Sequence, residues 1–296
     1  MEKIKAAVIG YGNVGKYVVD ALLSAEDFDL RGIVGVRKAG MSVQGFTIVD
    51  NISKLGDIDV AILATPSRSV PKMAKELLAM GISTIDSFDI HGDIPALRAE
   101  LGAAAKAANA VSVLSAGWDP GSDSIVRTLL EALVPRGMTH TNFGPGMSMG
   151  HTVAVKAIAG VEDALSITEP MGSGIHRRMV YVSLKKGADF AAASAAIKSD
   201  PYFVHDETHV NAVDDISAIA DVAHGVLIER CGSSSGASNQ RLSFSMKINN
   251  PALTAQILVA SARAATRLSP GAYTMIEIPP VDFLPGSRES AVARLV

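Results

Sequence analysis

Residues 3–25 read KIKAAVIGYGNVGKYVVDALLSA, an apolar run followed by three spaced glycines and then a helical pattern. The run from Ile4 to Ile9 predicts a buried strand, and the residues from Val14 to Ser24 predict a helix. A strand before the glycines and a helix after them favour a dinucleotide-binding loop over a plain tight turn.

Each glycine of this loop has a predicted role. Gly10 allows the tight turn, Gly12 lets the pyrophosphate approach bare backbone, and Gly15 lets the helix pack close to the strand. The first turn of the helix offers free N–H groups and a positive dipole end to phosphates. We therefore expect the cofactor on the following residues: Gly10, Tyr11, Gly12, Asn13 and Val14.

The end of the second predicted strand, Leu30 to Val36, indicates which dinucleotide binds. An NAD site usually has a carboxylate about twenty residues after the glycines, where it accepts hydrogen bonds from the ribose. This chain has Arg37 and Lys38 there instead. A guanidinium fork and an ammonium suit a 2′-phosphate, so NADP is predicted. The alternative is a solvated loop after an edge strand.

Composition limits the class of protein. The chain has 296 residues, of which 48% are hydrophobic and 19% charged, with a net charge of −3. It is predicted to be globular and to bind neither nucleic acid nor membranes. Cys231 is the only cysteine, which excludes an internal disulfide, and we expect it to be a small buried side chain. With no signal peptide or membrane span apparent, a cytoplasmic location is expected.

The first 120 residues alternate apolar runs with helical patterns, as repeated βαβ units do. Further strands are expected at 60–64, 84–87 and 111–115, and helices at 70–80 and 94–108. Parallel strands place their carboxyl ends at one edge of the sheet, where ligands bind. The loops at that edge supply the remaining expected cofactor contacts: Pro66, Ser67, Arg68, Ser69, Ser87, Phe88, Asp89, Gly117, Trp118, Asp119, Pro120 and Gly121.

The pattern changes after Pro120. A helix near 124–133 and a glycine-rich passage at 142–151 precede strand-like runs at 165–168, 179–184, 222–230 and 242–248, with one helix near 190–198. Grouped strands favour a mostly antiparallel α+β domain. The predicted organisation is a Rossmann-type α/β domain over 1–120, completed by part of 250–296, and a substrate-binding and dimerisation domain over 121–250. A helix is expected from Asn250 to about Leu268.

Two aspartates suggest the chemistry. Asp89 and Asp119 each follow a buried strand, where the nicotinamide end of a cofactor is expected. Paired carboxylates can hold an ammonium and take its proton, as amine oxidation requires. An Asx-turn for Asp89 and a helix cap for Asp119 are equally compatible with position alone. Trp118, the single tryptophan, suits a flat wall of the site or a core position.

No metal site is predicted. His205 and His209 are four residues apart, but aspartate rather than glutamate follows the first, so the zincin pattern fails. His151 and His224 lie beside glycines in turn-like contexts and could contact a polar ligand. Arg178 could clamp a carboxylate or be an ordinary surface arginine.

Several segments together resemble meso-diaminopimelate dehydrogenase, over essentially the whole chain. They are GYGNVG (residues 10–15), DSFDIHGD (86–93), AGWDPG (116–121), NFGPGMSMGH (142–151) and NNP (249–251). The resemblance is to the shorter branch of the family. It implies a homodimer in lysine biosynthesis that performs NADP-dependent, reversible oxidative deamination at the D-centre of meso-2,6-diaminopimelate, giving L-2-amino-6-oxopimelate, ammonia and NADPH.

The resemblance also assigns roles to residues. Asp89 and Asp119 surround the reacting amine, and His151 lines the pocket wall. Three residues shape the reacting end: Trp118, Met149 and Gly150. Four grip the distal L-amino acid group: Thr168, Arg178, His224 and Asn250. One departure is Val36, where many relatives have serine or arginine before Arg37. Two other readings are a reductase of a cyclic precursor in the same pathway and a non-catalytic NADP(H)-sensing protein.

Overall fold

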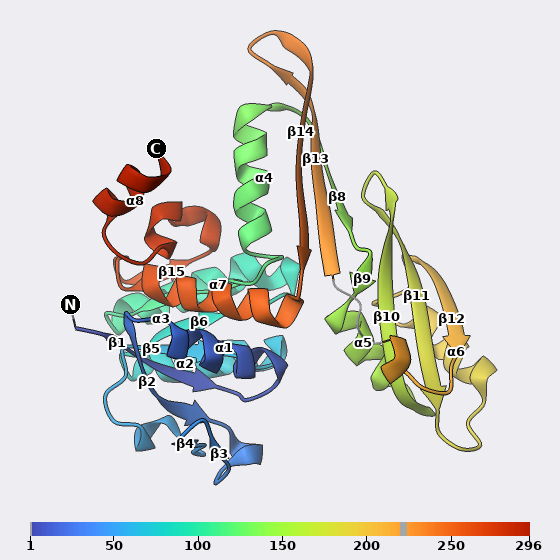
Figure 1. Ribbon diagram of the computed structural model, residues 1–296, viewed down its shortest axis with the longest axis horizontal. Helices are drawn as coiled ribbons and strands as arrows, with labels where there is room; N and C mark the ends of the chain where they lie inside the picture. Colours follow the sequence, from blue (N-terminus) through green and yellow to red (C-terminus); the bar gives the residue numbers. More distant parts are fainter. Residues whose placement is uncertain (1, 220–223) are drawn as a thin grey trace. The chain divides into compact units, whose positions relative to one another are not determined.

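A computed structural model describes residues 2–219 and 224–296. The chain divides into two compact units, the first comprising Met1–Thr128 and Pro251–Val296 and the second Leu129–Asn250 (Figure 1). The first two residues of the strand expected at 222–230 lie outside the described residues. No described helix has both the length and the apolar character needed to cross a membrane.

The first unit contains a six-stranded parallel sheet in the order β15-β7-β6-β5-β1-β2. Five of its strands were expected, with bounds shifted by up to two residues. The strands are β1 (Ile4–Ile9), β2 (Phe28–Val34), β5 (Val60–Leu63), β6 (Ser83–Asp86), β7 (Val111–Val113) and β15 (Gly271–Tyr273). The sixth strand, β15, was not predicted, because three residues give too short a pattern. It joins the C-terminal segment to this sheet.

Helices cover the sheet as the alternating pattern predicts. They are α1 (Asn13–Ser24), α2 (Val70–Ala79), α3 (Ile94–Ala107) and α7 (Asn250–Ala265), with α8 (Arg288–Leu295) near the C-terminus. The short hairpin of β3 (Ser42–Val43) and β4 (Phe46–Thr47) follows β2. Strands buried on both faces and the inner sides of α2 and α3 form one core, with Leu63, Leu78 and Leu101 fully enclosed. The carboxyl ends of the strands are therefore supported by a packed hydrophobic core.

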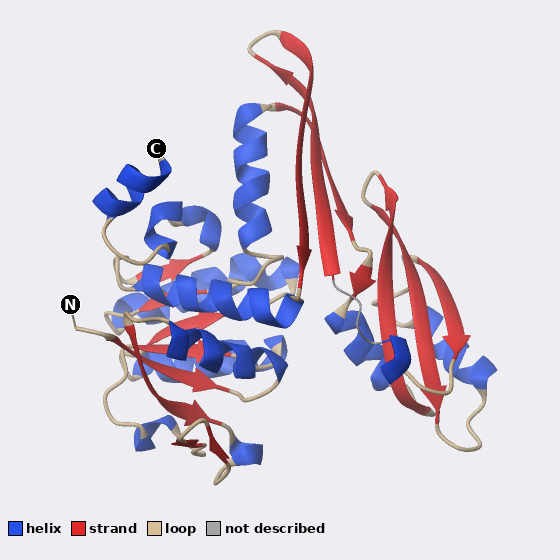
Figure 2. Cartoon of the chain, viewed as in Figure 1, coloured by secondary structure: helices blue, strands red, loops and turns tan. Residues whose placement is uncertain are grey.

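The second unit contains two sheets, as Figure 2 shows in red. One has the order β12-β11-β10-β9 and the other β14-β13-β8. Their pairs are antiparallel except β11 with β12. The elements after α4 (Ser122–Leu133) are β8 (Arg136–Phe143), β9 (Gly146–Met147), α5 (Met149–Lys156), β10 (Val161–Gly172), β11 (Ile175–Leu184), α6 (Phe190–Ser199), β12 (Glu207–Ala212), β13 (His224–Ser234) and β14 (Ala237–Ile248).

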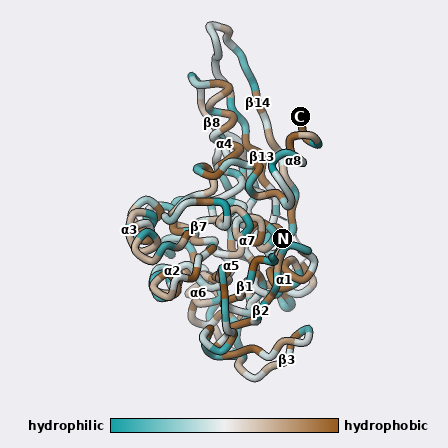
Figure 3. Tube along the Cα trace, turned by 90° about the vertical axis from the view of Figure 1, so that its left-hand side faces the viewer, coloured by the Kyte–Doolittle hydropathy of each residue, from teal (hydrophilic) through white to brown (hydrophobic). Residues whose placement is uncertain are grey.

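Four of these elements were not predicted. β8 and β12 consist mainly of polar residues, β9 lies inside the glycine-rich passage, and α5 begins inside it. Val155 on α5 and Ile197 on α6 are fully buried against Val180 and Val182 on β11, so both helices cover the same sheet. The tip of the β13–β14 hairpin is coloured white to teal in Figure 3, in agreement with its serines and asparagine.

The exposure of Cys231 differs from the expectation. The sequence predicts a small buried side chain, but Cys231 is exposed on β13. Side chains alternate along a strand, and Arg230 takes the inward position. Its Nε donates to the Val134 carbonyl at 2.7 Å and its Nη1 to the Thr139 hydroxyl at 2.7 Å. A buried arginine with these partners leaves the thiol facing outward.

Candidate active site

The glycine loop has the geometry that its sequence predicts. Gly10 has φ +98°, and a Cβ there would lie 2.4 Å from the Ala64 carbonyl oxygen; a Cβ on Gly15 would lie 2.1 Å from the Gly10 oxygen. A Cβ on Gly12 would meet nothing within 4 Å. Gly12 is also the N-cap of α1 and has no side chain to bond its first N–H groups. Open space next to an uncapped helix N-terminus fits a phosphate group.

The two cations after β2 occupy different positions. Arg37 is exposed, whereas the Lys38 Nζ donates to the Tyr11 carbonyl at 2.7 Å and lies 5.3 Å from the centre of the Tyr11 ring. Lys38 thus fastens the glycine loop to the end of β2. Arg37 remains available to a ligand, and Val36, 78% exposed, contributes an apolar surface beside it.

The loops after β5 and β6 meet at Asp89. The Ser67 hydroxyl donates to Asp89 Oδ1 at 2.6 Å, and the Asp89 N–H donates to Ser67 Oγ at 3.2 Å. Arg68 and Ser69 lie on the same single turn of 3-10 helix as Ser67, after Pro66. Phe88 is buried, which turns Asp89 outward at the end of the loop. The reciprocal bonds hold the Asp89 carboxylate at the carboxyl edge of the sheet.

The loop after β7 closes on itself around Asp119. The Gly117 N–H donates to the Pro120 carbonyl at 3.1 Å, and the Ser122 N–H donates to the Gly117 carbonyl at 3.1 Å. Gly121 has φ +142°, and a Cβ there would lie 1.8 Å from the Gly117 oxygen, so this position requires glycine. Trp118 is 7% exposed. This tight loop fixes where the Asp119 carboxylate lies.

Asp119 is paired with a residue that sequence reasoning missed. The Arg127 Nη1, two turns along α4, donates to Asp119 Oδ1 at 2.7 Å. The Asp119 side chain is only 8% exposed. Arg127 therefore holds one of the two oxygens of the Asp119 carboxylate.

Asp86, the last residue of β6, joins the two aspartate-bearing loops. Its Oδ1 accepts from the Phe88 N–H at 2.9 Å and the Ser115 N–H at 3.1 Å, and its carbonyl accepts from the Ala116 N–H at 2.7 Å. Complete burial raises the pKa of Asp86 to about 6, against the effect of the two N–H donors. The sequence signal for Asp86 is a carboxylate at the end of an apolar strand.

In the second unit, Arg178 is the centre of a polar cluster. It lies opposite Thr168 in the β10–β11 register and donates from Nη1 to the Thr168 hydroxyl. Its Nε donates to Asp206 Oδ2 at 2.6 Å. The Arg178 side chain is 11% exposed. Arg178 therefore lies within β11 and is held by its neighbours, unlike an ordinary surface arginine.

Three histidines surround this charge. Burial, followed by the positive charge of Arg178, lowers the pKa of His151 to about 4 and also lowers the pKa of His176. The pKa of His224 falls chiefly through burial, with Arg178 adding to it. Neutral imidazoles leave Arg178 as the cation of the cluster, with Asp206 as its anion and several hydrogen-bonding groups around the pair. Such a cluster suits the carboxylate of a ligand.

The surroundings of two histidines differ from expectation. His151 lies in the first turn of α5 after Met149 and Gly150, and His224 begins β13, so neither is in a turn. The Ser148 hydroxyl is 2.8 Å from His151 Nδ1, and Tyr202 and Phe203 contact the His151 ring edge-on. Asn250 begins α7.

His176 and Asp206 are additions to the predicted set. His176 is two residues before Arg178 on the same strand, and its Nε2 accepts from the Phe143 N–H at 2.8 Å. His205 and His209 do not share a helix, because His209 lies on β12 and bonds Glu207 at 2.6 Å. Among the residues the structure describes, no group of three or more His, Cys, Asp or Glu side chains could hold a metal ion.

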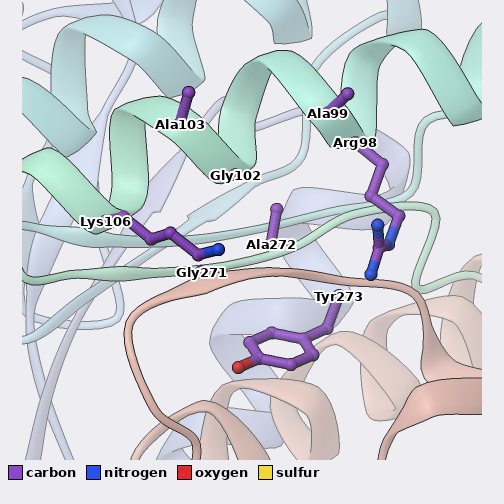
Figure 4. Close-up of a pocket in the computed structure, with 8 residues that line it drawn as sticks. All are labelled: Arg98, Ala99, Gly102, Ala103, Lys106, Gly271, Ala272 and Tyr273. Atoms are coloured by element: carbon purple, nitrogen blue, oxygen red, sulfur yellow. The ribbon is translucent and has the colours of Figure 1, made fainter.

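A separate hollow lies along α3 in the first unit (Figure 4). It is lined by small side chains of α3 and by β15, with Lys106 and Tyr273 at its sides. Arg98 beside it is bound to Glu277. None of the predicted site residues contributes to this hollow, so it is distinct from the cofactor loops.

Comparisons with known proteins agree with these features. Residues 117–177 match the model for the diaminopimelic acid dehydrogenase C-terminal domain, and residues 1–90 match that for a CoA binding domain. A meso-diaminopimelate D-dehydrogenase of Bacteroides fragilis is 58% identical, covering 100% of both chains. The Corynebacterium glutamicum DAP dehydrogenase in complex with DAP superposes with a TM-score of 0.91, at 31% identity and 100% coverage of both chains. An engineered D-amino acid dehydrogenase bound to NADP+ gives 0.87, at 30% identity over 99% of this chain and 100% of the other.

Proposed function

Because this chain belongs to the meso-diaminopimelate D-dehydrogenase family, we propose that it oxidatively deaminates meso-2,6-diaminopimelate at its D-centre, reversibly and with NADP. The products are L-2-amino-6-oxopimelate, ammonia and NADPH. The observation that carries this proposal is the 58% identity over the full chain. The two aspartates at the sheet edge and the Arg178 cluster provide the groups that the reaction needs.

The cofactor is held by residues of the first unit. The loop from Gly10 to Val14 and the N-terminus of α1 receive the pyrophosphate, and Arg37 meets the 2′-phosphate. The loops after β5, β6 and β7 line the remainder. When bound, NADP supplies the hydride acceptor for the D-carbon of the substrate.

The aspartates act on the reacting amine. An ammonium must lose its proton before hydride can leave the neighbouring carbon, so Asp89 and Asp119 hold the amine and accept that proton. Loss of hydride from the neutral amine leaves an iminium ion, and water adds to its carbon to give a carbinolamine, which releases ammonia and leaves the ketone. Trp118 of the first unit, and Met149 and Gly150 of the second, are the further residues that we assign to the reacting amine end of the substrate.

The distal end of the substrate is anchored separately. Arg178 meets the second carboxylate with its planar fork, and Thr168 fixes the guanidinium. His224 and Asn250 complete the contacts to the L-amino acid group, and His151 lines the wall along the aliphatic chain. One anchored end decides which of two similar carbons is oxidised.

The activity is tested by following NADPH formation with purified protein and the meso, LL and DD forms of diaminopimelate, with NADP and then NAD. Turnover with the meso form and NADP is expected, and the reverse reaction should require ammonia. Reduction of a cyclic precursor without ammonia would favour the reductase reading. Tight NADPH binding with no turnover of any form would favour the sensing protein.

Arg37→Ala should weaken NADPH binding and leave NADH binding nearly unchanged. Charged hydrogen bonds contribute about 1.5–3 kcal/mol, so the Kd for NADPH should rise roughly 10- to 100-fold by fluorescence titration. Arg31→Ala is the matched control, because Arg31 is exposed on β2 and bound to Asp29 at 3.0 Å. Equal losses for NADPH and NADH would contradict the role of Arg37.

We propose that the protein is a homodimer. Leu129 and Leu133, one turn apart on α4, are 58% and 53% exposed, and Met138 on β8 is 66% exposed. Three large apolar side chains exposed within residues 129–138 favour a protein interface. Sedimentation should give twice the chain mass of 30.8 kDa, and a monomer at micromolar concentration would contradict the proposal.

We further propose a place in lysine biosynthesis in the cytoplasm, with a small-molecule substrate and neither nucleic acid nor membrane as a partner. The net charge of −3 supports the last point. Expression in a bacterial strain that lacks its own route to diaminopimelate should restore growth without that compound. Failure by a well-expressed, active protein would contradict the pathway assignment.

A further inference from the structure

Asp123 is a buried carboxyl that the reaction described above does not use. It lies in the first turn of α4, four residues after Asp119 and four before Arg127. Its side chain is 0% exposed, and neither carboxyl oxygen has a hydrogen-bond partner among the described residues. Its N–H donates to the Trp118 carbonyl at 2.9 Å, which fixes it directly behind the catalytic loop.

The charged groups that act on Asp123 are Asp119 on the loop and Arg127 on its own helix. Burial and the negative charge of Asp119 raise the pKa of Asp123 to about 7, and Arg127 opposes this only partly. A helix N-terminus favours a charged carboxylate, but its effect of about 0.3–1 kcal/mol is smaller than the cost of burying an unpaired charge. Asp123 is therefore neutral at mildly acidic pH and ionises near neutrality.

Ionisation of Asp123 adds a second negative charge near the Arg127 guanidinium. Residues four apart on a helix are neighbours, so a charged Asp123 is within reach of the same guanidinium that now bonds Asp119. A neutral Asp123 offers no such attraction. The electrostatic attraction between Arg127 and Asp123 thus differs between the neutral and the ionised form of Asp123.

We propose that Asp123 is a positioning residue for Asp119: when neutral it leaves Arg127 on Asp119, and when ionised it draws Arg127 away and releases the Asp119 carboxylate to the substrate amine. This rests on the proposed role of Asp119 in amine oxidation. The proton leaves Asp123 to water, and no other bond is made or broken. Turnover should therefore rise as the pH passes neutrality.

The test compares the pH profiles of kcat/KM for diaminopimelate oxidation. Asp123→Asn stays neutral at every pH, so it should match the wild type within about twofold at pH 6 and fall about tenfold below it at pH 8.5. Arg127→Met removes the cation that bonds Asp119, so the Asp119 carboxylate is released at every pH. The variant's kcat/KM should therefore exceed the wild-type value at pH 6 and match it at pH 8.5, which flattens the increase of kcat/KM with pH. Glu131→Gln, on an exposed position of α4, is the matched control. If kcat/KM increases with pH in Asp123→Asn as it does in the wild type, the proposal is overturned.

Two readouts do not depend on activity. The infrared difference spectrum between the wild type and Asp123→Asn should show one protonated-carboxyl band that disappears as the pH passes about 7; the band of Asp86, which is protonated below about pH 6, cancels because both proteins contain it. A raised pKa in the folded state costs stability as pH rises from the unfolded value toward the folded one, so Asp123→Asn should have the higher Tm above pH 7 and an equal Tm near pH 4. A carboxyl ionised at all pH values above 5 would overturn the proposal.

Failure of the underlying function gives a different pattern. A wild type that does not oxidise diaminopimelate, or an Asp119→Asn variant with full turnover, contradicts the proposed function while the infrared titration still decides the protonation of Asp123. Impaired Asp119→Asn together with an unaltered pH profile in Asp123→Asn contradicts this inference alone.

Discussion

Asp119→Asn is expected to lower kcat/KM for meso-diaminopimelate by about 10²- to 10⁴-fold, the usual contribution of a positioned acid or base. Asparagine has the size of aspartate and can still accept the hydrogen bond from Arg127 that Asp119 Oδ1 accepts at 2.7 Å. It cannot take a proton from the ammonium. The substitution therefore removes the proton acceptor and leaves the loop in place.

The Kd for NADPH separates this role from a structural one. The tight loop depends on Gly117 and Gly121, not on the charge of Asp119, so NADPH binding should change less than about threefold. Asp93→Asn is the matched control, because Asp93 is exposed before α3 and makes no capping bond. Comparable losses in turnover and in NADPH binding would show that Asp119 holds the loop rather than the amine.

The first unit could be predicted well because its information is local. The strand, the glycine loop and α1 follow one another within 25 residues, and the positive φ of Gly10 requires the residue type that the sequence shows. Gly15 is required for another local reason, because a Cβ there would lie 2.1 Å from the Gly10 oxygen. A buried parallel strand is a continuous apolar run, so its pattern is distinct without any tertiary information.

The second unit was predicted less well for physical reasons. Polar strands such as β8 and β12 lack the apolar alternation that marks a half-buried strand. The exposure of Cys231 depended on which face of β13 is inward, and Arg230 is an unusual inward residue. The position of a residue in the sequence does not show which strands pair or which face of a strand is buried.

The same limit applied to the site. The expected residues could be named, but their partners come from distant segments: Asp206 bonds Arg178 across 28 residues, and Ser67 bonds Asp89 across 22. The burial of Asp123 likewise depends on packing that its neighbours in sequence do not reveal. The electrostatics of a site depend on such pairings, so they follow from the structure and not from the motif.

Arg178→Met should remove the anchor for the distal carboxylate. Methionine approximates the length of the arginine stem without its charge, and two lost charge-assisted hydrogen bonds amount to about 3–4 kcal/mol, or roughly 10²- to 10³-fold in kcat/KM. Most of this loss should appear as a higher KM for meso-diaminopimelate, because the anchor binds ground state and transition state alike. Steady-state kinetics across substrate concentrations measure the split.

Two comparisons show whether the loss comes from the anchor. Arg177→Met changes the adjacent arginine, which bonds Glu207 at 3.1 Å and is 32% exposed, and should leave kcat/KM within about twofold. D-norleucine has the reacting amine and carboxylate but no distal charged groups, so its poor turnover should not fall further in Arg178→Met. Discrimination between the two substrates would then shrink by the full 10²- to 10³-fold. An equal loss for both substrates would instead show that unpairing Asp206, which Arg178 bonds at 2.6 Å, disturbs the whole second unit.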